Sequence, residues 1–174
     1  MRVCPSADQL YDYAEEFDAV LVVTPHKTHP ALVMQAFAHD KHVLCDKPSA
    51  NALAPALEMN RAAEKSGLVF AMMFHQRRYK KYMRLKKLLD DGVLGEVKRV
   101  QLENSRYFRT WMYHRSGSWR SSWAGEGGGA LLNQGQHILD IWQWLFGMPE
   151  SIYAVIPYGK YNDCLLYTSD AADD

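Results

Sequence analysis

The sequence has few cysteines and no long apolar run, and these two absences exclude whole classes of protein. Its 174 residues contain three cysteines, Cys4, Cys45 and Cys164, which are too few and too widely spaced for a disulfide framework. No apolar run approaches the roughly 20 residues that a membrane-spanning helix needs, and no positively charged, apolar leader is present. We therefore expect a soluble protein of a reducing, cytoplasmic compartment, without a membrane partner.

The sequence also lacks a net charge. Lysine and arginine together number 20, as do aspartate and glutamate, and 48% of the residues are hydrophobic, which is enough for a folded core. A strongly basic segment, residues 77–87, is interleaved with tyrosines, as some nucleic-acid-binding segments are. Its apolar residues follow helical spacing, however, and Asp90 and Asp91 come soon after. This pattern favours a helix with a solvated basic face, and we expect no nucleic-acid partner.

A short apolar strand ends abruptly at an acid, a lysine and a proline. Residues 43–45 are Val-Leu-Cys, and Pro48 cannot donate a hydrogen bond to a sheet, so the strand must stop at Asp46-Lys47-Pro48. In an open parallel sheet, the loops at the carboxyl ends of the strands form the crevice in which ligands bind. A lysine there can hold and polarise a substrate hydroxyl. The competing interpretation is a solvated turn with an ordinary ion pair.

The neighbouring segments predict a parallel sheet around that strand. Residues 17–24 form another apolar strand that runs into Pro25, and residues 30–39 are helical in composition. A helix at 52–66, stopped by Gly67, and a strand at 68–74 follow. Strand, helix and strand in this order require a crossover, which predicts a βαβ unit and an α/β fold.

A second stretch places three polar side chains on one helix face. A glycine-rich run, residues 125–129, precedes a helical pattern in which Asn133, His137 and Asp140 are related by steps of four and three. The apolar residues gather on the opposite side and are expected to pack. A histidine there can accept a proton, whereas an asparagine can only orient a hydroxyl. The bland interpretation is a structural or solvated histidine.

Together these motifs resemble the Gfo/Idh/MocA oxidoreductases. The resemblance is carried by Thr24-Pro25 with His29, by Asp46-Lys47-Pro48, and by the glycine run with His137-x-x-Asp140. The usual family residues are glutamate where this chain has Asp46 and aspartate where it has Asn133. The resemblance implies NAD or NADP as cofactor and a sugar, glycoside or cyclitol as substrate. The substrate hydroxyl would give its proton to His137 while Lys47 holds the hydroxyl oxygen.

The resemblance also implies which residues line the site. Catalytic roles fall to Lys47, His137 and Asn133, and the same three with Asp140 would bind substrate. The residues implied for the cofactor are Thr24, Pro25, His29, Asp46, Lys47, Arg77, Trp119 and Arg120. Arg77 is followed five places later by Tyr82, which is the family's spacing. His39, His42 and Cys45 fit no zinc site, and we expect no metal.

A further absence bears on the domain organisation. The sequence has no Gly-x-Gly-x-x-Gly near its start, the turn whose backbone amides hold a dinucleotide pyrophosphate. We expect residues 1–95 to be the C-terminal part of a Rossmann-type parallel-sheet nucleotide domain. Residues 96–163, with strands at 97–108 and 151–157, would begin an α+β, mostly antiparallel domain for substrate binding and oligomerisation. Residues 164–174 resemble a translated sequencing adapter.

Expectations for the polypeptide follow from this organisation. We expect the 174-residue chain itself to be poorly soluble and to bind dinucleotide weakly, and the intact protein to be a homo-oligomer. Two alternatives to a dehydrogenase stay open: a glycosidase that oxidises C3 transiently, and a sugar or dinucleotide sensor. The presence of both Lys47 and His137 argues against the sensor, and accumulation of reduced cofactor separates a dehydrogenase from a glycosidase.

Overall fold

The computed structural model describes residues 2–104, 110, 112, 123–127, 129 and 131–155. The predictions for Trp119, Arg120 and the tail at 164–174 lie outside these described residues. The chain forms two compact units, one of Met1–Met73 with Ala124–Gly127 and one of Phe74–Trp123 with Gly128–Asp174.

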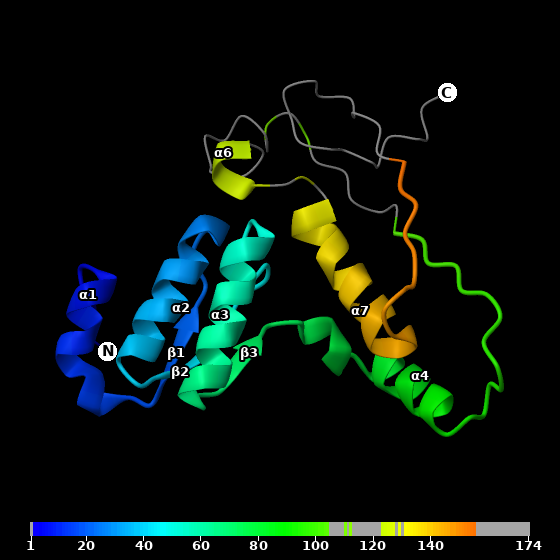
Figure 1. Ribbon diagram of the computed structural model, residues 1–174, viewed down its shortest axis with the longest axis horizontal. Coiled ribbons are helices and arrows are strands. Elements are labelled where there is room, and N and C mark those ends of the chain that lie inside the picture. Colours follow the sequence, from blue (N-terminus) through cyan, green and yellow to red (C-terminus); the bar gives the residue numbers. More distant parts are fainter. Residues whose placement is uncertain are drawn as a thin grey trace. The chain divides into compact units, whose positions relative to one another are not determined.

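A parallel sheet of three strands, in the order β1-β2-β3, forms the centre of the first unit (Figure 1). Its strands are β1 (Ala19–Val22), β2 (His42–Cys45) and β3 (Phe70–Met72). Val22 pairs with Cys45, and Cys45 with Met72, so the carboxyl ends of all three strands are level. The predicted βαβ arrangement and the end of β2 just before Asp46 are confirmed. Loops that follow the strands therefore leave from one edge of the sheet.

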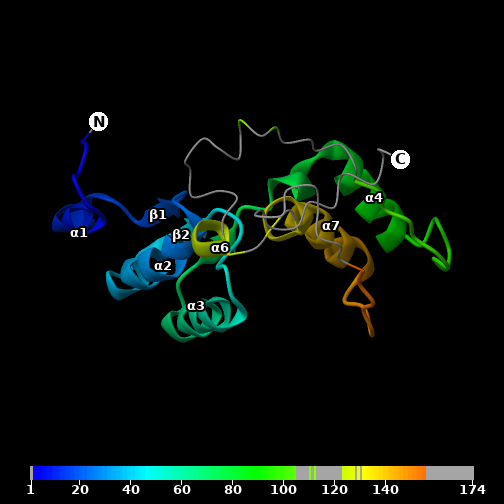
Figure 2. The ribbon, with the colours of Figure 1, turned by 90° about the horizontal axis from the view of Figure 1, so that it is seen from above.

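Helices α2 (His29–Ala38) and α3 (Leu53–Ser66) lie on the same side of this sheet (Figure 2). Every second strand residue points toward them, because successive side chains of a strand face opposite ways. The core beneath the helices consists of Val22, Val33, Ala36, Phe37, Val43, Cys45, Ala50 and Met59. Gly67 ends α3 in the left-handed conformation, with φ of 70°. The sheet and the two helices therefore form two layers with the core between them, and this packing fixes the positions of the strand ends.

The spacing of apolar residues predicts one helix over residues 8–16, whereas the structure has two helical segments there. Ser6 caps α1 (Ala7–Leu10), its hydroxyl accepting from the Gln9 amide, and the 3-10 segment η1 (Tyr11–Glu16) follows. Tyr13, with φ of −117°, is not helical. The spacing of apolar residues does not distinguish these helix types over so few residues, which is why the sequence predicted one helix.

The second unit contains the helices α4 (Lys80–Asp90) and α7 (Gln136–Phe146), the 3-10 segment η3 (His75–Arg78) and the π-helical segment η4 (Leu131–Gly135). Helix α4 packs on η3 and α7. The compact units divide at Met73/Phe74, and the domain boundary at residue 95 stays a prediction. On α4, Lys86 and Lys87 form ion pairs with Asp90 and Asp91 one turn away.

The two strands predicted for the second domain do not form in the described parts of their segments. Residues 97–104 and 151–155 have no strand structure. A strand is stabilised by its hydrogen-bonded ladder, and neither described segment pairs with another in the part of the chain described here. Apolar composition alone therefore overestimated the strand content of residues 97–104 and 151–155.

Candidate active site

The turn after β2 is tied into the end of the sheet through its backbone. The Asp46 amide donates to the carbonyl of Val22 at the end of β1, over 2.8 Å. The Lys47 amide donates to the Asp46 carboxylate, 2.9 Å away. The side chain of Lys47 is half-buried, and the following Pro48 is buried. These bonds hold Lys47 at the carboxyl edge of the sheet, which is where the sequence placed it.

A buried histidine links this turn to the neighbouring one. The ring of His29 lies with Nδ1 2.7 Å from the carbonyl oxygen of Pro48 and Nε2 2.7 Å from that of Thr24. Thr24 precedes Pro25 just after β1, and Pro48 follows Lys47 just after β2. The structure therefore brings together Thr24, His29 and the Asp46-Lys47-Pro48 turn.

Two further ionisable groups of this cluster escaped sequence reasoning. His26 and Glu126 are 5% and 1% exposed. Burial lowers the pKa of His26, the positive charges of Lys47 and His29 lower it further, and Glu126 opposes them through its backbone and its charge. In the sequence, Glu126 is only a charged residue inside a glycine run. Its burial becomes apparent only in the folded structure. The cluster around Lys47 therefore includes a buried imidazole whose pKa is lowered.

The close approach of α6 (Trp123–Glu126) explains a glycine in that run. Gly127 has φ of +79°, and a Cβ placed there would lie 2.5 Å from Cβ of Asn51. Both the dihedral angle and the contact exclude a larger residue. The neighbour that requires glycine at this position is Asn51, three residues after Pro48.

The thiol of Cys45 is adjacent to this turn but carries no chemistry. Burial first, and then the charge of Asp46, raises its pKa to about 12. A thiol, unlike a thiolate, is a poor nucleophile and metal ligand. No group of three or more potential metal ligands occurs among the residues that the structure describes.

In the second unit the polar row of α7 is buried. Asn133, in η4, and His137 and Asp140, in α7, are buried, and Ile141 and Leu145 continue the row. The His137 ring packs against those of His75 and Phe74, with centroids 4.9 and 6.5 Å away. The sequence placed Leu145 and Leu139 on the opposite, apolar face and expected that face to be the packed one, whereas Leu145 is buried along the same row as His137. Leu139 on that face is 54% exposed, so the prediction of burial was wrong there.

The π-helical segment explains part of this difference. A π-helical turn contains more residues than an α-helical one, which shifts the side chains that precede it around the helix axis. Asn133 lies in this segment, whereas His137 and Asp140 follow it. Counting at 3.6 residues a turn cannot show such a shift. Wide turns of this kind are frequent at functional sites.

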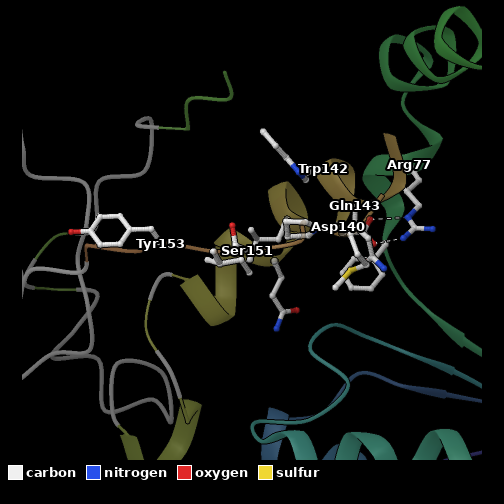
Figure 3. A pocket seen from close by; sticks show the side chains of 12 residues that line it. Arg77, Asp140, Trp142, Gln143, Ser151 and Tyr153 are labelled. Carbon is white, nitrogen blue, oxygen red and sulfur yellow. Dashed lines mark hydrogen bonds and ion pairs between the residues drawn. The ribbon is translucent and has the colours of Figure 1, made fainter. Parts of the chain in front are cut away.

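Asp140 is engaged by Arg77. Nε of Arg77 donates to one carboxylate oxygen over 2.8 Å and Nη2 donates to the other over 2.5 Å. The Asp140 side chain is 5% exposed and that of Arg77 is 38% exposed. The hydrogen bond to Asp140 and its charge raise the pKa of Arg77, against a smaller effect of burial. Figure 3 shows this two-pronged pair at one end of a cavity of about 700 Å³ between α7 and residues 148–153.

We expect Arg77→Ala to destabilise the second unit by about 1–3 kcal/mol, because it leaves a buried carboxylate without its donors. This range is below that for a fully buried pair, since water reaches part of Arg77. Urea unfolding followed by circular dichroism measures the effect, and Arg78→Ala, at an exposed arginine on the same segment, is the control. Equal stability of the two variants would contradict a structural role for the pair.

The two units thus each hold part of the predicted site. The first contains Thr24, Pro25, His29, Asp46 and Lys47, and the second contains Arg77, Asn133, His137 and Asp140. No helix among the described residues is long and apolar enough to cross a membrane.

Comparison with known proteins assigns both parts to one family. Residues 2–74 match the family model described as an oxidoreductase family with an NAD-binding Rossmann fold. Residues 82–173 match that of the GFO/IDH/MocA C-terminal domain. The chain belongs to the Gfo/Idh/MocA family. The resemblance found in the sequence is confirmed, and so is the Rossmann-type parallel sheet.

Several Gfo/Idh/MocA members are similar over most of this chain. The oxidoreductase YdgJ of Escherichia coli is 37% identical over 78% of the chain and 38% of its own length. The scyllo-inositol 2-dehydrogenase (NADP(+)) IolW of Bacillus subtilis is 30% identical over 92% of the chain and 45% of its own length. The WlbA dehydrogenase of Bordetella pertussis, solved with NADH and UDP-GlcNAcA, has a TM-score of 0.85 at 26% identity, covering 94% of this chain and 47% of that protein. The chain spans less than half the length of these relatives.

Proposed function

We propose that the protein is an NAD- or NADP-dependent oxidoreductase that acts on a hydroxyl-bearing carbon of a sugar, glycoside or cyclitol. The observation that carries the proposal is Lys47, held at the carboxyl edge of a parallel sheet by backbone bonds and by His29. Ligands of such sheets bind at that edge. Relatives named as dehydrogenases of scyllo-inositol, D-glucosides and levoglucosan support the substrate class.

The residues at this edge suit a dinucleotide. The loops after the three strands begin at the same edge of the sheet. Two of these loops carry Thr24 and Pro25, and Asp46 and Lys47, respectively. Lys47 supplies a half-buried cation near which a phosphate or ribose oxygen is favourable. We propose that these residues, together with Arg77, Trp119 and Arg120, hold the cofactor. When bound, NAD or NADP supplies the hydride acceptor.

Side chains of this protein remove the proton from the substrate hydroxyl. The Lys47 ammonium donates a hydrogen bond to the substrate oxygen, which stabilises negative charge as the hydroxyl ionises. The His137 ring accepts the hydroxyl proton, and the amide of Asn133 orients the hydroxyl, because an amide cannot take up a proton. The Arg77–Asp140 pair fixes α7 one turn from His137 and thereby holds the ring in place.

The test is formation of reduced cofactor by the protein expressed from its complete gene. Absorbance is followed with NAD and with NADP across inositols, glucosides, levoglucosan and nucleotide-linked sugars. We expect turnover with at least one of these polyols and none with simple alcohols, since several hydroxyls are needed for orientation. Absence of reduced cofactor with every polyol would contradict net oxidation.

A second candidate is a reaction without net redox change. One relative, 34% identical over 83% of this chain and 37% of its own length, is named as 2,7-anhydro-N-acetylneuraminate hydratase. Addition of water leaves no reduced cofactor behind, and neither does glycoside cleavage through transient C3 oxidation. Chromatography of the sugar products in the same reactions separates the candidates: new products without accumulated reduced cofactor would favour this second function.

A further inference from the structure

His29 has an unusual pair of hydrogen-bond partners. Both ring nitrogens lie 2.7 Å from backbone carbonyl oxygens, those of Pro48 and Thr24, and the residue is 0% exposed. A carbonyl oxygen can only accept a hydrogen bond, so each ring nitrogen must donate one. A neutral imidazole has one N–H and would set the lone pair of its other nitrogen against a carbonyl. Only the doubly protonated ring makes both bonds.

Groups of both charge signs belong to the cluster that contains this ring. Three groups disfavour a positive charge on His29. They are His26 on η2 (His26–Thr28), Lys47, and the positive dipole end at the N-terminus of α2. Against these stand the buried Glu126 on α6 and Asp46 beside Lys47. Burial lowers the pKa of His26, which disfavours a second imidazolium next to His29. The charged side chains of α3 are exposed, and they are Glu58, Arg61, Glu64 and Lys65.

We propose that His29 is a positioning residue, held as an imidazolium, which joins the turns after β1 and β2 and so sets the place of Lys47. Its two donors span adjacent strand ends, and one of them fixes the carbonyl of the residue next to Lys47. Since both nitrogens are used and the ring has no exposed surface, His29 acts on the site through the backbone and does not touch cofactor. Its effect on turnover rests on the proposed function of Lys47.

The decisive measurement is nitrogen-15 NMR of ring-labelled histidines in the protein expressed from its complete gene. We expect one ring to carry protons on both nitrogens at neutral pH and to vanish from the spectrum of His29→Gln. Nuclear Overhauser contacts to Thr24 identify the same ring if that variant does not fold. A His29 ring protonated on one nitrogen only would overturn the proposal.

The positioning role has its own readout. In folded His29→Gln the amide signals of Asp46 and Lys47 should shift, and kcat should fall about a hundredfold while KM for the sugar changes little. His39→Gln, at the exposed other end of α2, should change none of these. Unmoved Asp46 and Lys47 amides in folded His29→Gln would overturn the role. The NMR measurements need no turnover, so a doubly protonated ring and shifted amides in a protein inactive on sugars would refute the proposed function alone.

Discussion

We expect Lys47→Ala to lower kcat by about two to four orders of magnitude in the protein expressed from its complete gene, the range for a group that acts on the ionising hydroxyl. The ammonium stands half-buried at the end of β2, where its charge is screened less than at the surface. Its benefit grows as the substrate oxygen gains negative charge, so kcat should fall more than KM rises. Initial rates over a range of sugar concentrations give both constants.

The matched control for Lys47→Ala is Lys65→Ala, at an exposed lysine in the last turn of α3. It removes the same charge from the same unit without touching the strand ends, and it should leave kcat unchanged. Lys47→Arg is the sharper comparison. A guanidinium keeps the charge but presents a planar fork, so we expect only partial recovery of the rate. A Lys47→Ala enzyme that turns over as fast as Lys65→Ala would remove Lys47 from the mechanism.

The sheet of this protein was predictable because its signals are local. Apolar runs mark the strands, and Pro25 and Pro48 mark two of their ends, since proline cannot continue a sheet ladder. Gly67 marked the end of α3 for an equally local reason, as it adopts the left-handed conformation at no steric cost. From these, the parallel order of strands follows by the rules of βαβ connection.

The features that sequence reasoning missed depend on contacts between distant residues. Nothing near Glu126 in the sequence indicates that it is buried beside His26, because the fold brings residues 100 apart together. The sequence did not show that the His29 ring lies between two backbone carbonyls, because these belong to residues five and 19 positions away. The segment at 97–104 reads as a strand by composition, but a strand also needs a partner. Long-range partners decided each of these cases.

His137→Ala should likewise cost about two to four orders of magnitude in kcat, and more than Asn133→Ala costs. The imidazole can take up the hydroxyl proton and the amide can only orient it. Asn133 and His137 are 6% and 7% exposed, so a difference in burial does not explain a difference between the two variants. In the wild type kcat should rise with pH along a single ionisation, and that ionisation should be missing from His137→Ala.

His39→Gln serves as the histidine control and should keep the wild-type profile. A larger loss in Asn133→Ala than in His137→Ala, or a pH profile that survives the loss of His137, would show that another group accepts the proton.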